Sequence, residues 1–77
     1  MNLTMTARHG IKAVGMALGD ALVVIQRLSM GNFYKAMTVQ ADSHVWQDVY
    51  HAEWKGRALY IKFQNHEEFF IVSFKER

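Results

Sequence analysis

The stretch NFYKAMTVQADSHVWQDVY, residues 32–50, decides the fold of this chain of 77 residues. From Phe33 onward, Val, Thr and aromatic residues alternate with polar ones, which is the period of a β-strand. The pattern predicts strands over residues 33–40 and 44–54 and a turn at residues 41–43. Buried strands do not need Lys35 or Gln47 at their centres. Both polar residues therefore need an explanation.

Two further strands are predicted in the C-terminal part of the chain. In residues 58–64, apolar residues at odd positions alternate with polar ones at even positions. In residues 69–75 the apolar even positions 70, 72 and 74 are expected to share one face, opposite to Ile71, Ser73 and Lys75. The intervening turns are predicted at residues 55–57 and 65–68. Four strands in series, joined by short turns, indicate an antiparallel meander.

Before residue 33 the apolar spacing is helical. Ala7, Ile11 and Val14 predict a short helix over residues 7–14, with Thr6 as its N-cap and Gly15 as its C-cap. A second helix over residues 19–29 follows from the spacing of Leu18, Ala21, Leu22, Ile25 and Leu28. Residues 30–32 end this helix, and residues 2–5 form either an edge strand or a frayed end.

Helices that precede the strands along the chain indicate an α+β fold in a single domain, residues 1–77. We expect two short helices on one face of a mostly antiparallel sheet of four to five strands. That face would bury Leu22, Ile25, Leu59, Ile61, Phe63, Phe70, Val72 and Phe74. The opposite face would carry Tyr60, Lys62 and Lys75, joined by Lys35 and Gln47 if the strand register permits.

Composition narrows the possible functions. The chain has no Cys, which favours a reducing cytoplasm, and its longest apolar run, residues 21–25, is too short for a membrane span. The net charge of +2 permits an anionic partner. The four histidines, His9, His44, His51 and His66, lack metal-ligand spacing. We therefore expect no metal and no cofactor.

A set of Lys, Gln and Tyr side chains on one sheet face can cleave RNA without a metal. Lysines stabilise charge that develops on phosphate, Tyr transfers protons or stacks on a base, and Gln positions a base or a ribose hydroxyl. The alternative is an ordinary solvated surface. Trp46, Tyr50 and Trp54 are more typical of core or cross-strand packing than of base stacking.

Four sequence blocks resemble the MqsR family of bacterial toxin–antitoxin modules. They are FYKAMT at 33–38, WQDVY at 46–50, YIK at 60–62 and IVSFKE at 71–76, and the similarity runs from about Thr4 to Arg77. The resemblance implies a RelE-like fold. It also implies a cytoplasmic, metal-independent endoribonuclease that cuts messenger RNA at short sites containing G-C, which inhibits translation and growth.

The family's catalytic Lys, Gln, Tyr and Lys match Lys35, Gln47, Tyr60 and Lys75 in this sequence. On the same resemblance we expect contacts to RNA from Tyr34, His51, Lys62 and Arg77. The implied partner is a zinc-containing antitoxin with a helix-turn-helix domain. In that complex the antitoxin, and not this chain, would hold the metal.

Three departures from the family pattern have consequences. Relatives usually carry another amphipathic helix before the segment that corresponds to residues 3–5, so we expect uncovered apolar surface, low stability or a homodimer. The alternatives are a weak or inactive truncated variant that binds RNA or antitoxin, and a fragment of a longer reading frame. His51 stands where relatives often carry Arg, so it is expected to hold phosphate less well or to serve as a proton donor. Residues 30–32 replace a more acidic link, which should change the local charge and not the chemistry.

Overall fold

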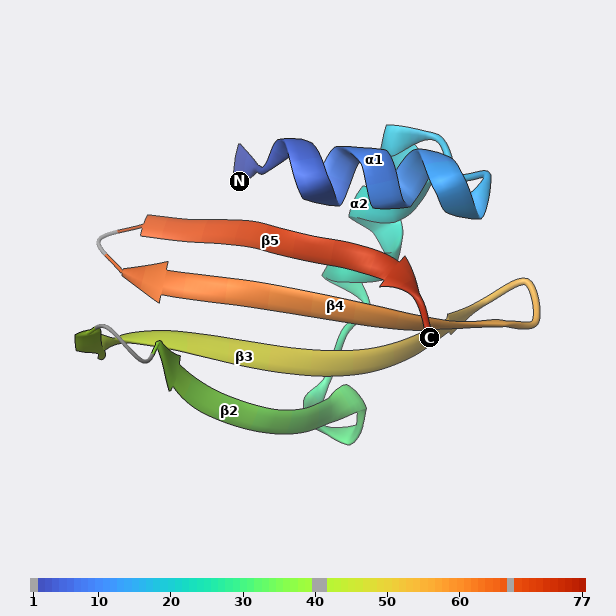
Figure 1. The fold of residues 1–77 in the computed structure, drawn as a ribbon. Coiled ribbons are helices and arrows are strands. Elements are labelled where there is room, and N and C mark those ends of the chain that lie inside the picture. Colours follow the sequence, from blue (N-terminus) through green and yellow to red (C-terminus); the bar gives the residue numbers. More distant parts are fainter. Residues whose placement is uncertain (1, 40–41, 67) are drawn as a thin grey trace.

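The structure is a computed structural model that describes residues 2–39, 42–66 and 68–77. These residues form two α-helices, a short 3-10 helix and a five-stranded sheet in the order β1-β5-β4-β3-β2. Both α-helices lie on the same side of the sheet (Figure 1), so the predicted α+β class is confirmed. The elements are β1 (Asn2–Leu3), α1 (Met5–Val14), α2 (Leu18–Gln26), the 3-10 helix (Met30–Asn32), β2 (Phe33–Val39), β3 (Asp42–Trp54), β4 (Arg57–His66) and β5 (Glu68–Glu76).

The strands β2 to β5 form the predicted antiparallel meander. The edge strand expected in residues 2–5 is β1, which pairs in parallel with β5 and sets Leu3 opposite Ile71. The last strand of the chain therefore lies inside the sheet, between β4 and β1, and the edges are β1 and β2. Within the described residues, neither helix has the length and apolarity that crossing a membrane requires.

Two of the predicted turns, at residues 41–43 and 65–68, contain strand residues in the structure. Asp42 and Ser43 of the first turn belong to β3, whereas Ala41 and the last residue of the predicted strand 33–40, Gln40, lie outside the described residues. The strands β4 and β5 likewise extend to His66 and from Glu68. Polar side chains do not end these strands because backbone pairing continues in the hairpin, where His66 lies opposite Glu68.

Helix α1 begins two residues earlier than the sequence pattern predicts. The N-cap is Thr4 and not Thr6, since the Thr4 hydroxyl accepts from the Ala7 backbone N–H at 3.1 Å. The same hydroxyl donates to the Val72 carbonyl at 3.1 Å, which ties the helix start to β5. The predicted C-cap is confirmed, because Gly15 has φ of 86°, a conformation that glycine adopts without strain.

A close approach of backbones joins α1 to β5. A Cβ atom built on Gly10 would lie 1.6 Å from the carbonyl oxygen of Phe74, so only glycine fits at this position. The contact brings Ile11 and Val14 of the helix into the core, where both are buried. Gly10 thus sets the distance between the helix layer and the strand that carries Lys75.

Helix α2 ends at Gln26, three residues before the predicted end at residue 29. Ala21 and Ile25 are buried beneath it, but Leu22, which was predicted to be buried, is 37% exposed. Successive helix positions are about 100° apart, so the turn that directs Ala21 into the core directs Leu22 away from it. Leu18 and Val23 are exposed as well, at 43% and 46%.

The core lies between the helices and the sheet. Leu59, Ile61, Ile71 and Phe74 are the largest side chains in it that solvent does not reach. The prediction that Val72 shares the core with Phe74 is wrong, because the register shifts between Lys62 and Phe63. This bulge sets Ile71 opposite Phe63 and leaves Val72 half-buried, so Ile71 takes the buried position instead.

Aromatic rings extend the helix side of the sheet across β2, β3 and β4. Tyr50 makes edge-to-face contacts with Phe33 at 5.5 Å and with Phe63 at 5.4 Å between ring centroids. Tyr50 and Trp54 both pack against the core, as predicted. Trp46 is 51% exposed, so it anchors the strand less firmly than expected.

Candidate active site

The strand register brings all four predicted catalytic side chains to the face of the sheet that the helices leave open. His51 pairs with Tyr60, and Tyr60 pairs with Lys75, so these three residues lie side by side on β3, β4 and β5. We call them the His51 row. The next row contains Lys35, Val49, Lys62 and Ser73, and the third contains Met37, Gln47 and Gln64. The condition on which Lys35 and Gln47 were expected to join this face is therefore met.

The His51 row holds a cation beside an aromatic ring. The Nζ atom of Lys75 lies 5.1 Å from the centroid of the Tyr60 ring, within the range of a cation–π contact. The imidazole of His51 lies 6.2 Å from the same ring on the other side. A phosphate seated above Tyr60 would thus meet a positive charge and two side chains that can exchange protons.

Tyr34 connects the His51 row to Lys35. The register between β2 and β3 shifts at this point, since Phe33 lies opposite Tyr50 while Lys35 lies opposite Val49. Tyr34 is the extra residue of this bulge, and its ring stacks on His51 at 4.2 Å with an interplanar angle of 18°. The Lys35 Nζ atom lies 5.6 Å from the Tyr34 ring centroid, so the bulge gathers Lys35, Tyr34 and His51.

Val49 is an apolar residue in the middle of this otherwise polar face. It is fully shielded from solvent, although it lies outside the core cluster under the helices. Its neighbours across the sheet are Lys35 and Lys62. Long lysine side chains bury their methylene stems and keep their ammonium groups in water. Val49 therefore packs beneath the methylene stems of Lys35 and Lys62, and we call its place the floor position.

Gln47 lies away from the other predicted catalytic residues. It pairs with Gln64, and its Nε2 atom donates to the Gln64 Oε1 atom at 3.1 Å. Its row is separated from the His51 row by four residues of β3, which is about 13 Å at strand spacing. The structure thus connects Lys35 to Tyr60 and Lys75 through the rings of Tyr34 and His51, whereas Gln47 lies further along the same face.

The expected RNA contacts divide in the same way. Tyr34 and His51 belong to the cluster, and Lys62 occupies the middle row beside Val49. Arg77 follows β5, and its backbone N–H donates to the Ala58 carbonyl at 2.8 Å. Arg77 also lines a shallow groove of about 510 Å³ with Asn32, His51, Ala52 and Glu53. A strand of RNA that crosses the His51 row would enter this groove.

The electrostatics of the cluster favour an anion. Partial burial lowers the pKa of the His51 imidazole below its usual value, and the positive charges of Arg77 and Lys35 lower it further. The imidazole is therefore uncharged at neutral pH, while the cations around it retain the capacity to bind phosphate. In the described part of the chain, no three His, Asp or Glu side chains gather as a metal site requires.

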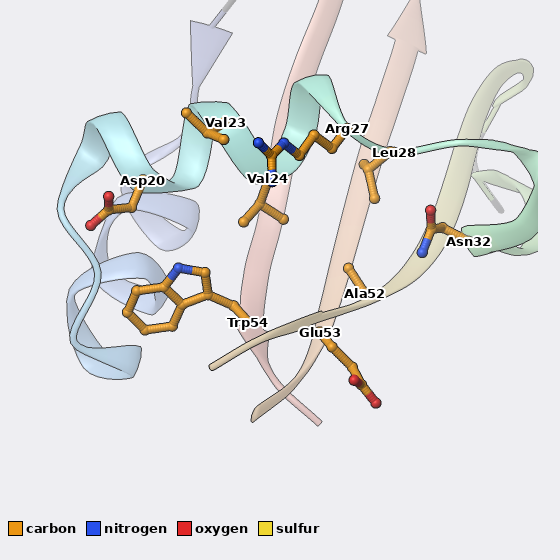
Figure 2. Close-up of a pocket in the computed structure, with 9 residues that line it drawn as sticks. All are labelled: Asp20, Val23, Val24, Arg27, Leu28, Asn32, Ala52, Glu53 and Trp54. Carbon is orange, nitrogen blue, oxygen red and sulfur yellow. The ribbon is translucent and has the colours of Figure 1, made fainter. Parts of the chain in front are cut away.

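A second hollow, of about 290 Å³, lies on the helix side of the sheet. It opens between α2 and the end of β3, with Trp54 beneath Val24 and with Asn32 at its far end (Figure 2). The Glu53 carboxylate points away from the helix in this view. The hollow is lined by polar and apolar residues of α2 and by Trp54, and the candidate catalytic cluster lies on the other face, so the two are separate features.

Sequence reasoning missed the structural roles of three residues at or beside the open face. Gln64 was assigned to the polar side of its strand, but its hydrogen bond to Gln47 depends on the strand register. The floor position of Val49 was hidden because an apolar residue in a strand indicates burial without saying on which face. Asn32, whose Nδ2 donates to the His51 carbonyl at 3.0 Å, appeared only as a turn residue.

Comparison with known proteins identifies the class of this chain. Residues 1–76 match the MqsR toxin family, described as motility quorum-sensing regulator, toxin of MqsA, and the chain belongs to this family. It is 35% identical over 74 residues to the mRNA interferase toxin MqsR of Escherichia coli (strain K12). That match covers 96% of this chain and 76% of the relative. No solved structure matches the chain, so the likeness to RelE folds stays a prediction.

Proposed function

We propose that this toxin is an endoribonuclease that cleaves messenger RNA. The observation that carries the proposal is the cluster of Lys35, Tyr60 and Lys75 on the open face, linked through Tyr34 and His51. The relative from Escherichia coli is named an mRNA interferase, which supports the same activity. Cleavage of messenger RNA would inhibit translation and growth in the cytoplasm.

The chemistry follows from the residue types. The ribose 2′-hydroxyl of RNA supplies the nucleophile, so the protein needs only to orient it, move protons and stabilise the pentacovalent phosphorus. Lys35 and Lys75 contact the phosphate, and their charges stabilise the negative charge that develops there. Tyr60, which lies beside Lys75, protonates the leaving oxygen. The products are a 2′,3′-cyclic phosphate and a 5′-hydroxyl.

The remaining polar residues of the face would hold the RNA on both sides of the scissile bond. Lys62 and Arg77 bind flanking phosphates, and Tyr34 and His51 contact the nucleotide at the cleavage point. Gln47 positions a base, and its distance from Tyr60 suits a nucleotide further along the strand. Selection of short sites that contain G-C belongs to this part of the surface.

Cleavage in EDTA tests the activity and its independence from metal. Purified wild-type protein should cut a defined RNA in EDTA and leave cyclic phosphate ends. Lys35→Ala and Tyr60→Phe should each lower the rate by about 100-fold, the usual contribution of one acid–base or electrostatic group. Lys12→Ala is the matched control, since Lys12 is exposed on α1, away from the open face. Cleavage that requires added Mg²⁺ would reject this mechanism.

A second function, binding of RNA or antitoxin with little cleavage, is favoured by one observation. Gln47 is bonded to Gln64 and lies about 13 Å of strand from the His51 row, so the four family residues do not converge on one atom. Turnover separates the two functions. An excess of RNA cut to completion indicates an enzyme, whereas stoichiometric binding without product indicates a binding module.

The proposed protein partner is an antitoxin that contains zinc and a helix-turn-helix domain. The family description, toxin of MqsA, supports an antitoxin partner. Induced expression of this chain should arrest growth, and co-expression of the antitoxin should relieve the arrest. Arrest that persists with the antitoxin bound in a stable complex would show that binding does not neutralise the toxin.

We further propose a homodimer through the uncovered surface of α2. Leu18, Leu22 and Val23 are exposed there by 37% to 46%, and such contiguous apolar surface favours association. Sedimentation equilibrium should show a concentration-dependent dimer. Leu22→Lys should shift the equilibrium to monomer without loss of RNA cleavage, because the open face lies on the other side of the sheet. A wild-type monomer at all concentrations would reject the dimer.

A further inference from the structure

RNA cleavage by the 2′-hydroxyl needs a group that removes its proton. Ammonium and phenol groups ordinarily hold their protons at neutral pH, so lysines and tyrosines serve more readily as donors. A glutamine amide does not titrate in this range. Imidazole is the side chain whose ordinary titration range includes neutral pH, and it accepts a proton through a ring nitrogen. His51 brings an imidazole into the cluster of Lys35, Tyr60 and Lys75.

The geometry around His51 holds its ring and leaves its edge open. Tyr34 stacks flat on the imidazole at 4.2 Å, which restrains the ring through its face and not through its nitrogens. The backbone is held as well, since Asn32 Nδ2 donates to the His51 carbonyl at 3.0 Å. His51 also lines the groove of about 510 Å³ together with Arg77 and Glu53, so substrate in this groove can reach the residue.

We propose that His51 is the general base of the RNA cleavage reaction and that Tyr34 positions it. The inference rests on the proposed endoribonuclease function and assigns a residue to its proton-removing step. His51 lies in the same row as Tyr60 and Lys75, so a phosphodiester above Tyr60 has an acceptor on one side and donors on the other. That arrangement suits in-line attack, in which the entering and leaving oxygens lie on opposite sides of the phosphorus.

In the proposed step, a ring nitrogen of His51 takes the proton of the ribose 2′-hydroxyl. The 2′-oxygen forms a bond to phosphorus, and the bond from phosphorus to the 5′-oxygen breaks. The departing 5′-oxygen takes a proton from the Tyr60 phenol, next to Lys75, to give the 5′-hydroxyl. His51 ends as imidazolium and Tyr60 as phenolate, and exchange of one proton through water restores both.

The charged and titratable groups that surround the imidazole are Tyr34 and Lys35 from β2, Glu53 from β3, Tyr60 and Lys62 from β4, Lys75 from β5, and Arg77. Burial, Arg77 and Lys35 together lower the pKa of His51, so the accepting form predominates at neutral pH. On the acid side, the rate should therefore fall as the pH drops through this lowered pKa, which lies below the usual 6.5.

The pH dependence of kcat/KM tests the assignment, because this ratio reports groups of the free enzyme. In EDTA, wild-type protein should show an acid limb below pH 6.5. His51→Gln and His51→Arg should lower cleavage at pH 7.5 by about 100-fold or more and remove that limb. Both should still bind an uncleavable 2′-O-methyl RNA, and His51→Arg should bind it at least as tightly. His9→Gln, on exposed α1, is the matched control.

A substrate with sulfur in place of the 5′-oxygen separates base from acid, because a thiolate leaves without a proton. Tyr60→Phe should recover most of its lost rate on this substrate, whereas His51→Gln should not. Recovery of His51→Gln would make His51 the acid and overturn the assignment. The assignment would also be overturned if folded His51→Gln or His51→Arg protein kept the kcat/KM of the wild type. It would equally be overturned if the pH profile of the wild-type protein had no acid limb. Absence of wild-type cleavage at every pH would overturn the proposed function itself, and the assignment with it.

Discussion

Val49 shows how a single residue can support a candidate catalytic surface without any chemistry of its own. It is sealed from solvent on a face that otherwise carries lysines, a tyrosine and glutamines. The packing beneath Lys35 and Lys62 limits how far their stems can move toward the sheet. Ammonium groups that are already held in position stabilise a developing negative charge without a further loss of side-chain entropy.

Val49→Thr tests this role because it keeps the shape of the side chain and adds a hydroxyl. A buried hydroxyl without a partner should lower the free energy of unfolding by about 1–3 kcal/mol. The matched control is Val23→Thr, at a position that is 46% exposed, where we expect little change. Urea denaturation measures both. Equal stability of the two variants would show that Val49 is not sealed in solution.

Several site residues followed from the sequence because strand period and resemblance pointed to the same positions. Lys35, Tyr60 and Lys75 were expected on one face and lie there. The clustering of Tyr34 with His51 could not be predicted, since it depends on a register shift that leaves no mark in the alternation of residues.

At the scale of elements, register shifts separate the predicted sheet from the observed one, and two of the three in the described strands change which residues reach the site or the core. The bulge in β2 redirects Tyr34 toward His51, and the bulge near Lys62 exchanges Val72 for Ile71 in the core. Periodicity locates a strand but assumes an uninterrupted pleat. The number and antiparallel direction of β2 to β5 were therefore predictable, whereas the strand order of the sheet and the faces of residues beyond each bulge were not.

Helix α1 presses against β5 through Gly10, and this contact can be tested alone. Gly10→Ala places a methyl group against the Phe74 carbonyl, where there is no space, and should lower the free energy of unfolding by about 1–3 kcal/mol or prevent folding. Gly19→Ala makes the same change in α2 in open space, and should stabilise the helix by up to about 1 kcal/mol. Thermal unfolding of the pair measures the difference. If both variants gain stability, the helix is not seated on β5.

At the scale of the whole molecule, the two sides of the sheet have different tasks. One is covered by both helices and holds the apolar core, and the other presents Lys35, Lys62 and Lys75, with Arg77 beside them. The net charge is only +2, so attraction of RNA depends on where the cations lie and not on their sum. Exposed charges act over about 8 Å at physiological salt.

The salt dependence of RNA binding should report this surface. For single strands, the logarithm of the binding constant falls by about 0.7 per phosphate contact for each tenfold rise in salt. Lys35, Lys62, Lys75 and Arg77 together predict a slope of about −3 for the logarithm of the binding constant of uncleavable RNA against the logarithm of salt concentration. Lys62→Ala should reduce the slope by about 0.7, whereas Lys12→Ala on α1 should leave it unchanged. A slope that Lys62→Ala does not alter would remove Lys62 from the RNA path.

The position of β5 inside the sheet affects how the protein is made. During synthesis, the helices and β2 to β4 leave the ribosome first, but neither β1 nor α1 has a place to dock until β5 arrives between β1 and β4. The same strand delivers Lys75. A growing chain therefore has neither a closed sheet nor a complete site. Synthesis of β5 thus completes the sheet and the candidate site together.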